Sequence, residues 1–233
     1  MDKRKLGHYK GQLFPSQIAE GINAAIRNAK RLVEDAEIML ERNRYPSAVS
    51  LAILSIEESG KRSILRGLSL AKNDKELKEA WKDYRSHTKK NIAWIIIDMF
   101  KNGARKFDDF LPMFREDAEH PYILDQVKQI SFYTDCLGNA HWSIPEEVID
   151  ENLAKMMVDL AKIFISHKKV TEKEIELWAK HIGTVSKKNM AWMKIALENF
   201  YSEMQECGLD PEGLNKMRDF NKGIIKIRKD TQD

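Results

Sequence analysis

Charged side chains follow directly on an apolar stretch of this sequence, at a spacing that could support chemistry. Residues 48–56 are largely apolar, and Glu57, Glu58 and Lys61 come immediately after them. Helical residues four positions apart lie on one face, so Glu57 can meet Lys61 and Glu58 can meet Arg62. Buried charges are costly unless they are paired. The stretch therefore predicts ion pairs in a partly buried helix.

A second polar group follows one helix later, at His87 and Lys90. If the two helices pack antiparallel, these side chains come near Glu57 and Glu58. Gly60 lies between the carboxylates and the next apolar residues, although glycine costs about 1 kcal/mol relative to alanine inside a helix. Its presence predicts the close approach of another backbone or a bound group, or relief of crowding between packed helices.

These residue types are compatible with several roles. As purely structural ion pairs, they would fix the register between helices. They could instead supply acid–base chemistry, bind phosphate through the cations, or hold a metal through the carboxylates and His87. A metal is the least favoured role because no second histidine or Glu-x-x-His motif accompanies them. We expect no metal and no other cofactor.

Hydrophobic periodicity predicts helices around this polar group and indicates no strand of useful length. The second predicted helix has apolar residues on every face, which is typical of a helix at the centre of a bundle. We expect one all-α domain over residues 1–233, made of a bundle at 15–169 and a C-terminal helical extension at 170–233. An irregular connection is predicted at 104–121. The predicted helices cover residues 15–42, 46–70, 73–100, 123–137, 145–169 and 171–207.

Composition argues against several classes of protein. The 39 basic and 36 acidic residues give a formal net charge of +3 with the signs interspersed, which is no nucleic-acid footprint by itself. The two cysteines cannot form a disulfide framework, which fits a reducing cytosol. The longest strongly apolar run, 92–97, is far shorter than the roughly 18 residues of a membrane span. We therefore expect a cytoplasmic protein without a membrane partner.

Several stretches, taken in order, resemble the AbiV family of bacterial abortive-infection proteins, which belongs to the HEPN superfamily of helical domains. Together they cover about residues 15 to 165. The matching residues are Asn28-Ala29 and Asp35-Ala36 before Leu40, Ala48 to Lys61 with its Glu-Glu-Ser-Gly-Lys ending, Ser86-His87 with Lys90, and Phe132-Tyr133-Thr134-Asp135 followed by Trp142 and Pro145.

The resemblance implies a HEPN-like helical bundle with additional C-terminal helices and a role in antiviral defence in the cytoplasm. It implies arrest of translation during phage infection, with a phage protein as one partner and RNA or the translation machinery as another. Many proteins of the superfamily form homodimers and act as metal-independent ribonucleases, using an arginine and a histidine four to six positions apart. Ribonuclease activity is therefore the alternative to action by binding alone.

Arg115 and His120 have the spacing of that catalytic pair. About one such spacing is expected by chance in a chain of this composition, and Pro121 biases His120 away from helical geometry. Tyr133 and Asp135 are further binding candidates within the matching stretch. Tyr133 is either a core tyrosine or a ligand contact, and Asp135 either contacts a ligand or caps a local turn.

Overall fold

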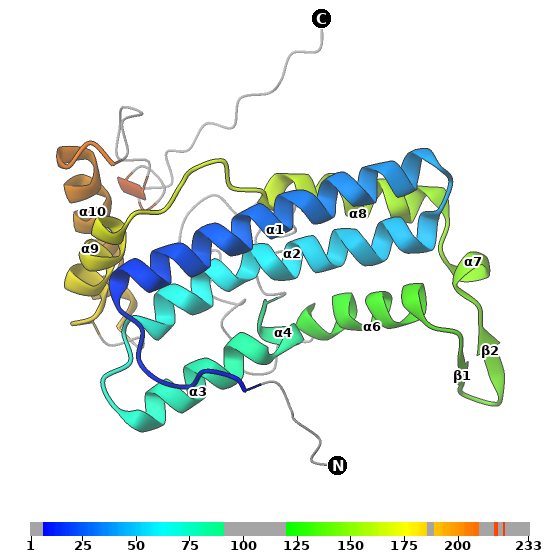
Figure 1. Cartoon of the computed structure of the whole chain (residues 1–233), viewed down its shortest axis with the longest axis horizontal. Coiled ribbons are helices and arrows are strands. Elements are labelled where there is room, and N and C mark those ends of the chain that lie inside the picture. The colour runs from blue at the N-terminus through cyan, green and yellow to red at the C-terminus, as the bar shows by residue number, and fades with distance from the viewer. Residues whose placement is uncertain (1–6, 91–119, 186–188, 210–216, 219–220, 222–233) are drawn as a thin grey trace, which may run out of the picture.

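A computed structural model describes residues 7–90, 120–185, 189–209, 217–218 and 221 of the chain. In this part the protein is all-α apart from one small hairpin, which confirms the predicted fold class (Figure 1). No helix among these residues is both long and apolar enough to cross a membrane. The elements, in chain order, are α1 (Pro15–Glu41), α2 (Tyr45–Leu68), α3 (Asp74–Arg85), α4 (His87–Lys90), α6 (His120–Phe132), β1 (Asp135–Leu137), β2 (His141–Ser143), α7 (Pro145–Val148), α8 (Glu151–Phe164), α9 (Glu172–Ile182) and α10 (Met190–Glu206).

Helices α1 and α2 form a long antiparallel pair, joined by a tight turn in which Asn43 has a positive φ of 57°. Pro15 and Pro46 lie in the first turns of the two helices, where the missing N–H costs no hydrogen bond. The buried residues of α1 recur at three- and four-residue steps along one stripe that faces the bundle. They are Ile18, Ala19, Ile22, Ala25, Ala29, Leu32, Val33 and Ala36.

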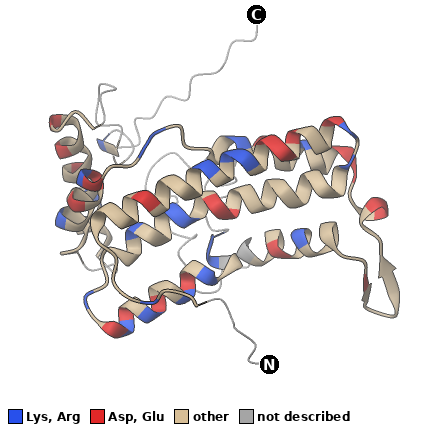
Figure 2. Ribbon diagram, viewed as in Figure 1, with Lys and Arg blue, Asp and Glu red and all other residues tan. Residues whose placement is uncertain are grey.

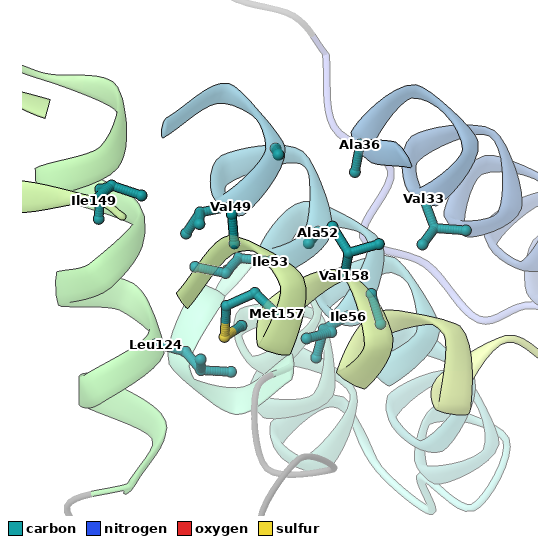
Figure 3. Packing of buried hydrophobic residues seen from close by; sticks show 13 residues of the cluster. Val33, Ala36, Val49, Ala52, Ile53, Ile56, Leu124, Ile149, Met157 and Val158 are labelled. Atoms are coloured by element: carbon teal, nitrogen blue, oxygen red, sulfur yellow. The ribbon is translucent and has the colours of Figure 1, made fainter. Parts of the chain in front are cut away.

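Helix α2 is the central helix of the bundle, as its all-round apolar sequence predicts. It contacts α1, α3, α4, α6, α7 and α8. The main core lies between α2 and its neighbours, where Val49, Ile53 and Ile56 pack against Leu124 of α6 and Met157 of α8 (Figure 3). Because α2 has neighbours on most sides, any charged residue within it must lie close to groups from other helices.

The prediction of one helix over 73–100 is wrong at Ser86, and its part beyond residue 90 lies outside the described residues. Ser86 has an extended backbone with ψ 126°, and it separates α3 from α4. Its hydroxyl accepts a 3.4 Å hydrogen bond from the Lys89 amide, so it caps the helix that follows. The break sets the direction in which α4 approaches α2.

The prediction of a helix over 123–137 is also wrong at its end. Helix α6 stops at Phe132, and β1 then pairs with β2 in an antiparallel hairpin that projects from one end of the bundle (Figure 1). Gly138 and Ala140 take positive φ values of 51° and 61° in the turn between them. Each strand has only three residues, which is too short for an alternating pattern to be recognised in the sequence.

Two further long helices are each divided in two. The helix expected over 145–169 is α7 followed by α8, and Asp150 caps α8 by accepting a 2.8 Å bond from the Leu153 amide. The helix expected over 171–207 is α9 followed by α10, which Asn189 caps through the Trp192 amide. Asp and Asn end one helix and start another because their side chains replace the missing backbone acceptors.

Candidate functional site

Glu57, in the middle of α2, contacts basic side chains from two other helices. Its side chain is only 4% exposed. Its Oε1 accepts a 2.7 Å hydrogen bond from Lys128 Nζ on α6, and its Oε2 lies 2.7 Å from His87 Nδ1 on α4. Lys128 also pairs with Asp125 Oδ1 at 2.9 Å. The buried carboxylate is therefore compensated, which is the condition for keeping a charge inside a bundle.

Packing of α6 on α2 places Lys128 beside Glu57. Leu124, Lys128 and Ser131 lie on one face of α6, and all three are buried. Ser131 Oγ lies 2.7 Å from Ser50 Oγ of α2, which fixes the two helices side by side. Burial lowers the pKa of Lys128, but the hydrogen bonds to Glu57 and Asp125 outweigh it and raise the pKa overall.

Gly60 is the point where the backbones of α2 and α4 come together. A Cβ atom built at Gly60 would lie 2.1 Å from the carbonyl oxygen of Lys90. No side chain fits in that space, so glycine is required for α4 to lie on α2. Of the three predicted explanations, the close approach of another backbone is the one that applies.

Lys90 is buried beside these residues, with 8% of its surface exposed. Burial is the main cause that lowers its pKa, and the neighbouring Lys61 lowers it further, against the opposing effects of Glu57 and Glu58. Its ammonium makes no hydrogen bond or ion pair with any other described residue. Within the part of the chain that the structure describes, Lys90 is thus the charge of this group that lacks a direct partner.

The predicted pairing within α2 is wrong. Lys61 pairs with Glu58, three positions away, at 2.5 Å, and its ammonium lies 5.4 Å from the centre of the Tyr84 ring. The Glu57 side chain instead contacts residues of α4 and α6, and Arg62 pairs with Glu174 of α9. The general expectation that His87 and Lys90 approach the α2 carboxylates agrees with the geometry.

Tyr133 and Asp135 lie on the hairpin side of α6, and no hydrogen bond or ion pair among the described residues joins them to Glu57. The Tyr133 side chain is 60% exposed, so it is not a core tyrosine. Asp135 Oδ1 accepts a 2.8 Å hydrogen bond from the Cys136 amide, which is a local contact. These two residues therefore belong to a different surface.

Arg115 lies outside the described residues, so its pairing with His120 stays a prediction. His120 is the first residue of α6. Pro121 was expected to bias His120 away from helical geometry, yet α6 begins at His120, because proline is well accommodated in a first helical turn.

Sequence reasoning missed two groups that complete these clusters. Lys128 is one of them. Its spacing from Leu124 and Ser131 places the three residues on one helical face, and this pattern indicated that Lys128 is buried. The other is Glu174 of α9, which is buried and binds Arg66 and, at 3.3 Å, Arg62 of α2. Among the His, Cys, Asp and Glu residues that the structure describes, no group is arranged to hold a metal ion.

The Arg66 guanidinium also stacks on the aromatic rings of the extension. It lies 5.0 Å from the centre of the Trp178 ring and 5.9 Å from that of Phe200. Burial and the neighbouring Arg62 lower its pKa, although Glu174 opposes this effect. The cluster attaches α9 and α10 to the centre of the bundle.

The fold and the charged cluster define a class of protein: a helical bundle whose central helix carries a buried carboxylate paired with basic side chains of neighbouring helices. The family model HEPN_AbiV, described as AbiV, matches residues 17–166, which is more than half of the chain. The chain belongs to the AbiV family, and this membership gives it a role in abortive infection, which is a form of phage defence. No curated protein and no solved structure matches the chain. The family match ends before α9 and α10.

Proposed function

We propose that this protein defends the cell by binding a phage protein and thereby arresting phage protein synthesis in the cytoplasm. Family membership supports the defence role. The observation that carries the binding mode is the exposed apolar surface around the hairpin. We call it the hairpin surface, and it consists of the side chains of Phe132, Tyr133, Leu137, Trp142 and Val148, all of them exposed.

Aromatic residues on the hairpin surface have the chemistry of protein-interface anchors. Trp142 is 63% exposed, and the Phe132 and Tyr133 rings lie 5.9 Å apart at the end of α6. Tryptophan and tyrosine supply much of the binding energy at protein interfaces, and clustered exposed apolar groups mark interaction sites. A projecting hairpin with such residues suits contact with another protein.

Phage challenge of cells that carry the gene tests this proposal. We expect Trp142→Ala to lower protection to the level of cells without the gene, and phage protein synthesis, measured by labelled methionine, to continue. Trp192→Ala on α10 is the matched control because Trp192 is 61% exposed. Full protection by the Trp142 variant, at normal protein levels, would rule out binding through the hairpin surface.

A homodimer and a contact with RNA or the translation machinery remain part of the proposal through the family resemblance. Sedimentation of the purified protein at micromolar concentration measures the first, and a monomer there would count against it. Ribosome co-sedimentation from infected cells measures the second.

A metal-independent ribonuclease is the second candidate, and the contact between His87 and Glu57 favours it. Glu57 contacts Nδ1 of the imidazole, while the His87 side chain remains 56% exposed, which leaves Nε2 as the nitrogen that would act on a substrate. A carboxylate that orients a histidine is a common arrangement for proton transfer. Lys90 lies close enough to Glu57 and Lys61 for their charges to act on its pKa, so cations belong to the same site. In this scheme His87 moves the proton and Glu57 is a positioning residue.

Purified protein incubated with RNA in the presence of EDTA tests the nuclease. If His87 moves the proton, His87→Ala abolishes cleavage, whereas the exposed His167→Ala leaves it unchanged. Glu57→Gln should change the pH profile of cleavage because it alters the group that orients the ring. Equal cleavage by the His87 variant and the wild type would exclude this site.

A further inference from the structure

The end of the bundle that carries the hairpin is acidic, and its stretch of sequence contains no lysine or arginine. Between Lys128 and Lys155 there is no lysine or arginine, and every carboxylate in this stretch is exposed. Figure 2 shows negative charge on α7 and no positive charge on the hairpin. The carboxylates are those of Asp135, Glu146, Glu147, Asp150 and Glu151.

Part of this charge is already used within the protein. Glu151 pairs with Lys155 at 2.6 Å, and Asp150 caps α8. Glu146 and Glu147, on the short helix α7, form no ion pair with any residue in the described ranges. They remain available to a partner.

The register of the hairpin directs its tryptophan outward. Cys136 is paired with Trp142, and Asp135 is paired with Ser143. Successive residues of a strand point to opposite faces, so Trp142 and Cys136 share the face opposite that of Ser143. Ser143 is buried, and Trp142 and Cys136 are exposed. Trp142 therefore lies on an exposed face of the hairpin, and Leu137, which is exposed as well, lies on the face of Ser143.

We propose that the partner of the hairpin surface is a basic protein segment that also carries apolar side chains. Its lysines or arginines would meet Glu146 and Glu147, and an arginine could stack on Trp142 or Tyr133. The inference rests on the proposed binding function and names the chemistry of its partner. Nucleic acid does not fit this surface, because the carboxylates would repel the phosphates.

A photoactivatable phenylalanine analogue at position 136, introduced in living cells, tests the proposal directly. The site is exposed and lies on the same face as Trp142, so a bound partner comes within reach when infected cells are irradiated. A second protein with the analogue at the exposed Asn139 of the turn serves if the first does not protect against phage. Mass spectrometry then identifies the linked molecule and the linked segment.

We expect one protein to be linked, through a segment of net positive charge. The product should disappear with Trp142→Ala and with Glu146→Lys combined with Glu147→Lys. It should persist with Trp192→Ala and with the control reversals Glu79→Lys and Glu172→Lys, which change exposed acids on α3 and α9. High salt should weaken it, because charge pairs at a surface are screened.

Linked RNA, a linked second copy of this chain, a linked segment without positive charge, or no linked product at all would overturn the proposal. The protection assay separates this failure from failure of the proposed function. If Trp142→Ala abolishes protection but the linked segment is not basic, the binding function stands and only the partner chemistry is wrong. If Trp142→Ala protects fully, the binding function itself is wrong.

Discussion

Gly60 makes the contact between α2 and α4 possible because it lacks a single carbon atom. Its place in the middle of an apolar helix predicted a close approach, and the Lys90 carbonyl oxygen provides it. Helix propensity alone would favour alanine at this position. For Gly60→Ala, the geometry therefore predicts a loss of stability, whereas helix propensity predicts a gain.

We expect Gly60→Ala to destabilise the protein by at least about 2 kcal/mol, because the clash forces α4 away from α2. Gly67→Ala is the control in the same helix: a Cβ at Gly67 has no neighbour within 4 Å. That change should be neutral or stabilise by up to about 1 kcal/mol. Urea unfolding followed by circular dichroism measures both, and equal effects would contradict the steric argument.

Glu57 is the second residue on which the centre of the bundle depends. Among the described residues, replacing it with glutamine leaves Lys128 with one anionic partner and His87 with none. Because breaking a buried pair strands the remaining charge, we expect a loss of about 3 kcal/mol in the free energy of unfolding. Glu58→Gln, which affects a more exposed pair, should cost less than about 1 kcal/mol. Losses of similar size would show that burial does not set the cost.

The lowered pKa of Lys90 predicts how stability depends on pH. Between that lowered pKa and the ordinary value of 10.5, the native state binds fewer protons than the unfolded state. Stability therefore rises with pH in this window through Lys90. Compared with Lys90→Met, the wild type should gain stability as the pH approaches 10.5. Parallel stability curves for the two proteins would refute this.

The pKa of Lys128 is shifted in the opposite direction to that of Lys90, and this shift does not disturb the comparison. Its pKa is raised, so the stability it contributes is present below 10.5 and is lost as the pH rises through the raised value. The loss of stability from Lys128 falls above pH 10.5, whereas the gain from Lys90 falls below it, so the two effects occupy different pH windows.

At the scale of elements, α9 and α10 are attached to the bundle by charge as well as by apolar packing. Glu174 lies three residues after Thr171, which is the spacing of a capping box. The Thr171 hydroxyl does accept a bond from the Glu174 amide, but the carboxylate binds Arg62 and Arg66. One residue thus contributes to the start of α9 through its backbone and to its position through its side chain.

Glu174→Gln should loosen the extension, because Arg62 and Arg66 would lose their shared anionic partner. We expect a loss of about 3 kcal/mol. Hydrogen exchange should speed up in α9 and α10 more than in α1. Glu176→Gln, which changes an exposed residue of the same helix, is the control and should alter exchange little. Uniform acceleration over the whole chain would argue against a local attachment.

At the scale of the whole molecule, long-range regularities were predictable and local interruptions were not. The stripe of α1 and the all-round apolar face of α2 are patterns over many residues, so they predicted the bundle. Ser86, Asp150 and Asn189 interrupt helices through single cap bonds, and such residues look the same on an exposed helical face. The hairpin offered only two three-residue strands.

In the candidate site, too, one contact could be predicted from the sequence and others could not. The approach of His87 to Glu57 followed from one assumption, antiparallel packing of neighbouring helices. Lys128 lies 71 positions from Glu57, in an element whose place in the bundle depends on the intervening chain. Glu174 is 112 positions from Arg62. Pairings over such separations are decided by tertiary packing, which spacing within one helix does not reveal.

The contact of Glu174 with Arg62 and Arg66 also has an evolutionary consequence. The two arginines lie inside the part of the chain that the family model matches, whereas their anionic partner lies beyond it. Homologues that lack the extension would leave those guanidinium groups without this anionic partner. Across the family, basic residues at these two positions should therefore be inherited together with an acidic residue in the first turn of α9, and lost with it.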